Sequence, residues 1–166
     1  MEVAVVNMPP GEGRRTLWVL GELVTYKVSS QMTGGAYAMF EVATRAGAGA
    51  FPHVQHREDE CFYVLEGEYE FLVESRTSRV RAGSLLYIPK GTLHGHGSGG
   101  ERAGRMLITQ TPGGLYEHFF EEVGKPVGGK AEWLILKDES EVANIAAIAA
   151  KYGIEIPLPV AQHGRA

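Results

Sequence analysis

Side chains that bind transition metals gather in two short segments of the sequence. His53 and Glu60 lie in the first segment and His94 in the second. Imidazole nitrogens and carboxylate oxygens together suit divalent metals such as Fe, Mn, Ni, Cu or Zn. These three residues therefore predict a mononuclear metal site.

The period of an extended chain decides which neighbours share a face with these residues. Residues two apart point the same way, so Gln55 shares the face of His53, whereas His56 points to the opposite side. By the same count Phe62 shares the face of Glu60. A carboxylate on an apolar strand face is costly to bury unless it is paired or bound to a metal. That cost favours a functional role for Glu60.

The residues that position these side chains form a series of short β-type runs separated by turns. Of the 166 residues, 22 are glycine, nearly twice the usual share of roughly 7%. Short strands joined by tight turns are typical of a sandwich or closed barrel. The expected strands are residues 16–20, 23–29, 36–45, 61–65, 69–74, 80–81, 85–88 and 105–111.

The last third of the chain changes to a helical period. A helix is predicted between Pro112 and Gly124, capped by Thr111, and a second one over residues 139–152. The second helix is expected to pack on the outside of the barrel. The chain is thus divided into a lead-in (1–15), a barrel (16–112), a helical extension packed on it (113–153) and a tail (154–166).

Charge and composition exclude several classes of partner. The formal net charge is −4, so the chain lacks the basic excess of a nucleic-acid-binding protein. We expect no membrane partner and a cytoplasmic location, because no signal-like segment or long apolar run is present. Cys61 is the single cysteine, which rules out an intramolecular disulfide and a cysteine-rich zinc site. We assign it no catalytic role.

The two segments resemble the two signature motifs of the cupin superfamily. The first motif matches at Gly47, His53, Glu60 and Gly67; the second matches at Gly83, Pro89, Gly91 and His94, with Ser98 where asparagine is usual. The residues that flank the first motif most resemble those of small, single-domain, quercetin dioxygenase-like cupins. The resemblance implies an all-β chain: a single-domain cupin β-barrel (jelly roll, double-stranded β-helix) with C-terminal helices.

The resemblance also implies the metal ligands His53, Gln55, Glu60 and His94. The family's second histidine falls on Gln55, whose neutral amide oxygen is a weaker ligand than imidazole and should lower affinity for Cu or Ni most. Alternatively, His56 fills this place, since its spacing to Glu60 also satisfies the motif. Strand alternation favours Gln55 unless the chain bulges. His96 is expected to be a polar group of the pocket.

Two functions follow from the resemblance. The first is a metal-dependent, quercetinase-like dioxygenase that acts on a small aromatic or enolic molecule. In it Glu60 is the catalytic residue, serving as metal ligand and as general base if burial raises its pKa toward neutrality. The alternative is a non-catalytic cupin that binds a small molecule and has a weakened or lost metal site, which the change to Gln55 favours. Small cupins are commonly dimers, so a homodimer is expected. Six apolar residues are expected to line a ligand cavity or the barrel core: Tyr37, Met39, Phe51, Phe62, Tyr87 and Met106.

Overall fold

Short antiparallel strands make up most of the chain. The computed structural model describes residues 5–99, 102–127 and 139–157. Their elements run in the order β1 (Thr16–Val19), β2 (Glu22–Val28), α1 (Ser30–Thr33), β3 (Ala38–Thr44), β4 (Gly49–Gln55), β5 (Asp59–Glu66), β6 (Glu68–Val73), β7 (Arg76–Arg81), β8 (Leu85–Ile88), β9 (Leu93–Ser98), β10 (Gly104–Thr111), α2 (Leu115–Val123), β11 (Lys125–Pro126), α3 (Glu139–Lys151) and β12 (Ile154–Glu155).

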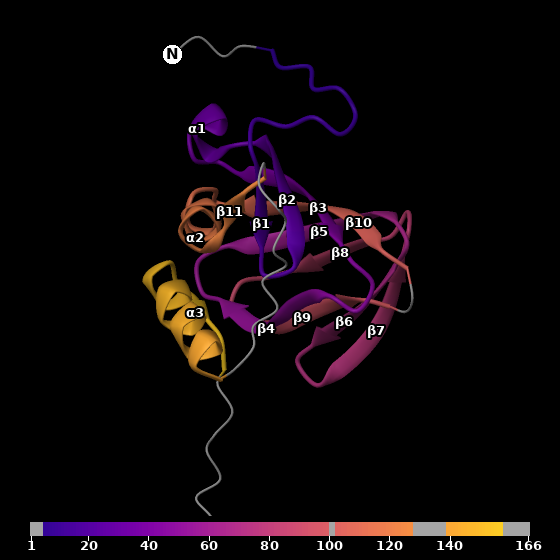
Figure 1. Cartoon of the computed structure of the whole chain (residues 1–166), viewed down its shortest axis with the longest axis vertical. Coiled ribbons are helices and arrows are strands. Elements are labelled where there is room, and N and C mark those ends of the chain that lie inside the picture. The colour runs from indigo at the N-terminus through magenta and orange to yellow at the C-terminus, as the bar shows by residue number, and fades with distance from the viewer. Residues whose placement is uncertain (1–4, 100–101, 128–138, 158–166) are drawn as a thin grey trace, which may run out of the picture.

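The strands form two sheets that face each other (Figure 1). One sheet has the order β11-β1-β2-β3-β10-β5-β8 and the other the order β12-β4-β9-β6-β7. Neighbours far apart in sequence, such as β3 and β10 or β4 and β9, pair antiparallel. This arrangement confirms the predicted all-β jelly roll, and it brings β4, β5 and β9 around one interior.

Strict alternation of buried and outward side chains builds that interior. On β5, Glu60, Phe62 and Val64 are buried, whereas Tyr63 is 42% exposed on the opposite face. Aromatic rings fill the space between the sheets, and Phe62 meets Phe71 edge to face with ring centroids 5.0 Å apart. The alternation therefore directs Glu60 into an apolar core, as its spacing to Phe62 predicts.

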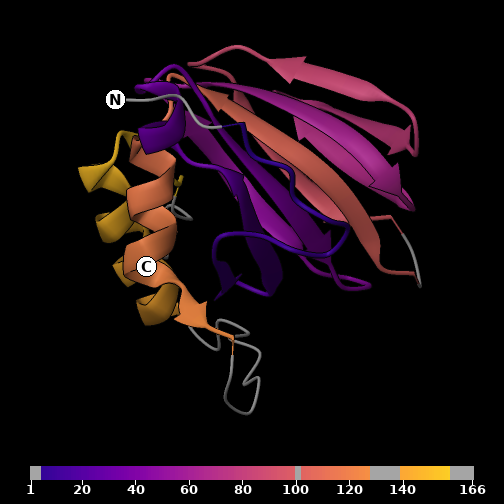
Figure 2. The same ribbon diagram turned by 90° about the horizontal axis from the view of Figure 1, so that it is seen from above.

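Both longer helices lie on one side of the sheets (Figures 1 and 2). Helix α2 buries Tyr116, Phe119 and Phe120, and Phe120 packs edge to face on Phe40 of β3 with centroids 5.2 Å apart. Helix α3 packs on α2 and β12 and buries Ala149 completely. The C-terminal helices thus cover the barrel through α2, with α3 behind it.

One detail of the C-terminal prediction is wrong. Helix α2 starts at Leu115 with Gly114 as its N-cap, because Thr111 is the last residue of β10 and its hydroxyl donates to the carbonyl of Ala36 at 3.0 Å. The predicted tail begins with a short strand, in which Ile154 pairs with Gln55 of β4. Residues 158–166 of the tail lie outside the described residues.

Ser98 ties two of the turns together where the motif usually has asparagine. Its hydroxyl donates to the carbonyl of Arg45 at 2.7 Å and accepts the N–H of Gly47 at 2.9 Å. Gly47 itself adopts a φ of +74°, a conformation that side chains other than glycine rarely take. Ser98 therefore fixes the turn that leads into β4 and so helps to position His53.

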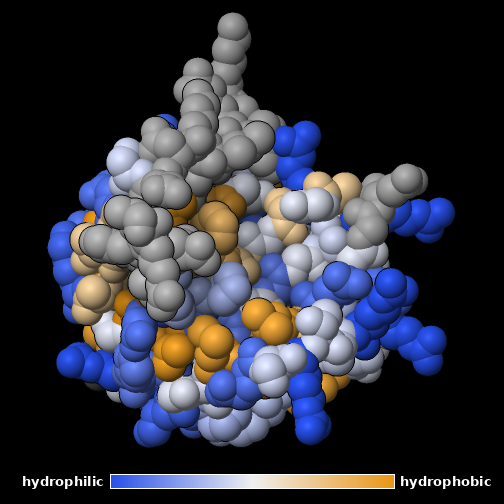
Figure 3. Space-filling model, turned by 90° about the horizontal axis from the view of Figure 1, so that it is seen from below, coloured by the Kyte–Doolittle hydropathy of each residue, from blue (hydrophilic) through white to orange (hydrophobic). Residues whose placement is uncertain are grey.

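The outer surface combines hydrophilic and hydrophobic residues. Seen from below, several hydrophobic residues are exposed among hydrophilic ones (Figure 3). Among the described residues, no helix is long and apolar enough to cross a membrane.

Candidate metal centre

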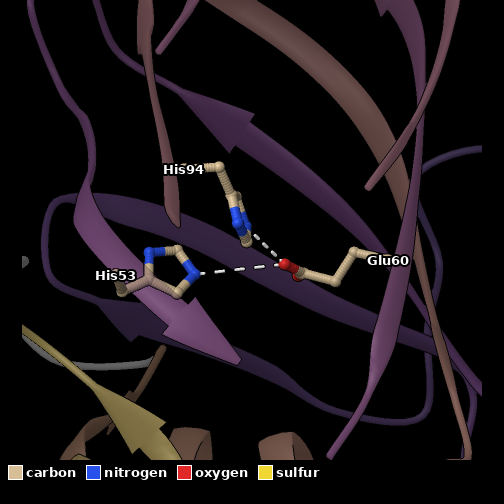
Figure 4. A group of neighbouring side chains, drawn as sticks. All are labelled: His53, Glu60 and His94. Atoms are coloured by element: carbon tan, nitrogen blue, oxygen red, sulfur yellow. Dashed lines mark ion pairs between the residues drawn. The ribbon is translucent and has the colours of Figure 1, made fainter. Parts of the chain in front are cut away.

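Three buried side chains from three strands converge inside the barrel. His53 on β4, Glu60 on β5 and His94 on β9 point toward one another (Figure 4). Nε2 of His94 lies 2.6 Å and Nε2 of His53 lies 4.0 Å from Oε2 of Glu60. The strand register explains the meeting, because His53 pairs directly with His94 and Glu60 faces them from the other sheet.

Backbone carbonyls orient both imidazole rings. Nδ1 of His53 donates to the carbonyl of Phe51 at 2.7 Å, and Nδ1 of His94 donates to that of Thr92 at 3.0 Å. Because a carbonyl oxygen only accepts, Nδ1 must carry a proton in each ring. Nε2 is then the atom left for a metal, and this second contact to each ring is the usual way in which proteins orient metal-binding histidines.

The contacts of the converging atoms test whether a cation fits. Nε2 of His53 is buried without a hydrogen-bond partner among the described residues, whereas Nε2 of His94 and Oε2 of Glu60 pair with each other at 2.6 Å. One atom from each residue lies within 4.8 Å of the others. Ligands held at 2.0–2.2 Å around one cation are themselves about 3–4 Å apart. The three residues therefore fit a single divalent cation.

Charge and burial act in opposite directions on this cluster. Burial alone would raise the pKa of Glu60, but the histidines outweigh it and lower that pKa. Burial lowers the pKa of His53 to about 4, against the attraction of Glu60. Burial would also lower the pKa of His94, but Glu60 reverses this and raises it. The expectation that burial brings the pKa of Glu60 up to neutrality is therefore wrong; an ionised carboxylate suits a ligand.

Two glutamines complete the polar interior. Gln110, opposite Glu60 on β10, donates its Nε2–H to Oε1 of Glu60 at 3.0 Å, which leaves Oε2 for a cation. Gln55 is 2% exposed on β4, and both of its amide atoms are buried without a hydrogen-bond partner among the described residues. Gln55 thus lies on the inner face beside His53, as alternation predicts; its role as a ligand stays a prediction.

His56 lies outside the barrel. Its side chain is 51% exposed, and its Nε2 meets Oε2 of Glu155 on β12 at 2.8 Å. The register of β4 shifts between Ala50 and His53, but the strand alternates from His53 to Gln55. Filling the fourth ligand place with His56 would require a second irregularity after Gln55. The arrangement disfavours His56 as a ligand.

A small cavity of about 40 Å³ lies beside the cluster and reaches it through His53. At 10–15 Å³ per water, it has room for roughly three water molecules. Its walls come from β1, β2, β4, α2 and the segment at β12, and they include Phe51, Tyr116, Phe119, Phe120, Ile154 and Ile156. Of the six apolar residues predicted for a cavity or core, Phe51 lines it, Phe62 and Met106 are buried in the core, Met39 is half-buried, and Tyr37 and Tyr87 are exposed.

The family comparison covers the strands that carry this cluster. The model of the cupin domain matches residues 39–109, a stretch that includes His53, Glu60 and His94. The β-barrel is a cupin domain. A comparison with curated protein sequences finds no match, so the quercetin dioxygenase-like subtype rests on the resemblance alone.

Solved structures support the cupin fold. The chain is similar to an RmlC-like cupin from Shewanella frigidimarina, with a TM-score of 0.52 and 19% identity over 65% of this chain and 92% of that one. The Cnp3 cupin domain of Schizosaccharomyces pombe gives 0.50 and 19% over 63% and 73%. KdgF from Halomonas sp. gives 0.50 and 23% over 55% and 79%. At these identities the likeness shows the fold alone.

The cupin interior holds a second buried acid–histidine pair that the sequence analysis missed. Oε1 of Glu22, the first residue of β2, lies 3.0 Å from Nε2 of His96 on β9. Glu22 also lines the cavity beside His53. The signal was present in the sequence, because Glu22 shares its strand face with the buried Val24 and Tyr26, the same pattern of a carboxylate on an apolar face that singled out Glu60.

Helix α2 adds Tyr116 to the cupin site and contacts the buried Glu58, which precedes β5. Tyr116 stacks over His53 with ring centroids 6.4 Å apart. The backbone N–H of Tyr116 donates to Oε1 of Glu58 at 3.4 Å, and Glu58 is 2% exposed. Neither residue belongs to a motif, and only the folding of α2 onto the barrel brings Tyr116 to His53.

Replacing Gln55 by histidine (Q55H) is expected to tighten metal binding. An imidazole at this buried position would add a nitrogen ligand in place of a neutral amide oxygen, and nitrogen ligands favour Ni, Cu and Zn. We expect the dissociation constant for Ni²⁺ or Zn²⁺, measured by calorimetric titration, to fall at least about 10-fold. The same substitution of an outward-facing β4 residue, V54H, should leave it unchanged. Equal affinities for Q55H and wild type would place residue 55 outside the ligand set.

Proposed function

We propose that this chain is a metal-dependent oxygenase that holds one divalent cation with His53, Glu60 and His94 and acts on a small enolic or aromatic molecule. Two histidines and one carboxylate with open coordination positions are the ligand set of non-haem Fe(II) oxygenases. The amide oxygen of Gln55 would be a weak fourth ligand. A quercetinase-like dioxygenase is the finer form of this proposal.

One observation carries the proposal: one donor atom each of His53, Glu60 and His94 lies within 4.8 Å of the others in the buried interior, and Nε2 of His53 has no hydrogen-bond partner among the described residues. A buried polar atom left unpaired costs about 1–3 kcal/mol. Nε2 of His53 bears this cost if the site has no occupant, because Oε2 of Glu60 lies 4.0 Å away and pairs with Nε2 of His94 at 2.6 Å instead. A bound cation would remove this cost and would bind all three residues.

The residues around the cation divide the remaining tasks. When bound, the metal would supply Lewis-acid stabilisation of a deprotonated substrate oxygen and the redox capacity that reaction with O₂ requires. Gln110 fixes the orientation of Glu60. Tyr116, Phe119 and Phe120 provide an apolar wall of the cavity beside His53.

The size of the cavity narrows the substrate. A volume of about 40 Å³ accepts a molecule of a few non-hydrogen atoms, whereas a three-ring flavonol requires the cavity to enlarge. Of the three cluster residues, His53 alone lines this space, and Tyr116 stacks on its ring. A small enolic molecule is therefore the preferred substrate, and a flavonol would need α2 to move.

Metal content and oxygen uptake test the proposal directly. Protein purified without chelators should contain near-stoichiometric Fe, Mn, Ni, Cu or Zn by elemental analysis, or take up the added ion. Oxygen consumption is then followed with small hydroxycarbonyls, catechol and a flavonol, with consumption by the small compounds expected. Protein that binds no divalent ion would refute the proposal. Metal-loaded protein that consumes no oxygen with any of these compounds would refute the oxygenase and leave the non-catalytic binding cupin.

The homodimer expected from the resemblance remains a separate prediction. Light scattering on the purified chain at micromolar concentration tests it, and a mass near 18.0 kDa would identify a monomer instead.

A further inference from the structure

Glu22 is a carboxylate at the edge of the cavity and outside the metal cluster. It opens β2 directly after the turn that follows β1, and it pairs in register with Thr44 of β3. Glu22 is 9% exposed. A buried charge must be compensated by hydrogen bonds or by an opposite charge. The contacts of the two carboxylate oxygens therefore indicate whether Glu22 is satisfied by the protein alone.

One oxygen of Glu22 is fully engaged by the protein. Oε1 accepts a hydrogen bond from the hydroxyl of Thr44 at 2.6 Å and lies 3.0 Å from Nε2 of His96. The hydroxyl of Tyr69 donates to Oγ1 of Thr44 at 3.1 Å, so the Thr44 proton is directed to Glu22. This chain of buried hydrogen bonds holds the carboxylate in one orientation.

The other oxygen is available to a ligand. Oε2 of Glu22 makes no hydrogen bond to any described residue, and Glu22 lines the same cavity as His53. The remaining lining is mostly apolar, with the rings of Phe51 and Tyr116 on other walls. A ligand in this cavity would thus meet an orienting acceptor at Glu22 and the metal-binding side of the barrel at His53.

We propose that Oε2 of Glu22 accepts a hydrogen bond from a hydroxyl group of the ligand, and that the ligand is a small α-hydroxycarbonyl or its enediol, whose neighbouring oxygen points to the His53 side. This inference deepens the proposed function and rests on it for the identity of that second oxygen's partner. Glu22 is then a specificity-determining residue that distinguishes a hydroxyl from an ether or a methyl group.

A neutral hydroxyl is favoured over an ammonium group at this position. An ammonium ligand would lie near a divalent cation at His53, and like charges repel most strongly where water is excluded. A hydroxyl donates one proton to the carboxylate without adding charge. Hydrogen bonds to charged acceptors are also the stronger kind.

Glu22→Gln tests this role because the network fixes which way the amide faces. The protons of Thr44 and His96 require an acceptor, so the amide oxygen of Gln takes the place of Oε1. The amide NH₂ then faces the cavity and donates where Oε2 accepted. The change reverses the hydrogen-bond character of the cavity wall with almost no change in size.

The experiment titrates hydroxyacetone and its methyl ether, methoxyacetone, into Zn²⁺-loaded and metal-free ¹⁵N-labelled protein by NMR. Wild type should bind hydroxyacetone more tightly than the ether. Glu22→Gln should bind hydroxyacetone about 10-fold or more weakly and lose the preference, while Zn²⁺ affinity stays within about twofold of wild type. The matched control Glu70→Gln neutralises an exposed carboxylate that pairs with Arg79, outside the cavity lining, and should retain the preference.

The outcomes separate this inference from the proposed function. Unchanged preference in folded Glu22→Gln, or no hydroxyacetone binding to wild type in either form, would overturn the role of Glu22. Failure of wild type to take up Zn²⁺ would instead overturn the metal site, and the metal-free titration would still decide the role of Glu22. If Glu22→Gln does not fold, Glu22→Asp, which withdraws the carboxylate by one methylene, should also weaken hydroxyacetone binding.

Discussion

Replacing His94 by alanine (H94A) is expected to abolish stoichiometric metal binding. His94 is 1% exposed, and its Nε2 lies 2.6 Å from Oε2 of Glu60. Loss of a residue that merely orients a ligand costs 10–100-fold in metal affinity, so loss of a ligand itself should cost more than about 100-fold. Calorimetric titration of Zn²⁺ and elemental analysis of the purified variant measure the effect.

His56→Ala is the matched control for this substitution. It removes a histidine close in sequence to the cluster but 51% exposed and held by Glu155. We expect its metal affinity to equal that of wild type. If H56A lost the metal and H94A kept it, the assignment of the cluster would be wrong. Circular dichroism and thermal melting of both variants show whether any loss comes from unfolding.

Alternation and motif spacing made the cluster of His53, Glu60 and His94 largely predictable. Glu60 was singled out because Phe62 shares its strand face, and the structure buries both. The opposite orientation of Gln55 and His56 follows from the same rule. These inferences succeed because they depend on the geometry of a single strand, which local sequence determines.

Features that depend on contacts between distant segments could not be predicted in this way. Glu22 joins His96 only because β2 and β9 face each other from separate sheets. Tyr116 reaches His53 only because α2 folds back onto the barrel. The start of α2 was predicted too early for a related reason. Thr111 lies in β10, and its hydroxyl donates a hydrogen bond to the carbonyl of Ala36, which is 75 residues away in the sequence.

The spacing of Glu58 to Glu60 predicts that its side chain points inward, but its pKa depends on contacts with distant segments. Glu58 precedes β5 and lies two residues before Glu60, so both carboxylates turn inward. Burial raises the pKa of Glu58 to about 7; the N–H of Tyr116 opposes this rise, and the charge of Glu60 adds to it. Glu58 therefore supports the start of α2 but is unfavourable there when ionised.

Replacing Glu58 by glutamine (E58Q) is expected to stabilise the metal-free protein at high pH. An acid whose pKa is higher in the folded state than its ordinary value of 4.5 binds more protons when folded, so stability falls as pH rises from about 4.5 to about 7. Above that range wild type carries the whole penalty, and E58Q carries none. Glutamine also keeps an oxygen to accept the N–H of Tyr116.

The expected gain is about 2 kcal/mol at pH 8, after allowance for solvent screening, and about 0.8 kcal/mol at pH 5. Urea unfolding of chelator-treated wild type and E58Q at both pH values measures it; chelation matters because a bound metal adds its own stabilisation. The exposed Glu70, paired with Arg79, provides the control E70Q, which should show no such dependence. A gain for E58Q that is equal at pH 5 and pH 8 would mean that Glu58 is ionised in the folded protein throughout this range, and its contact with α2 would then be an ordinary carboxylate cap.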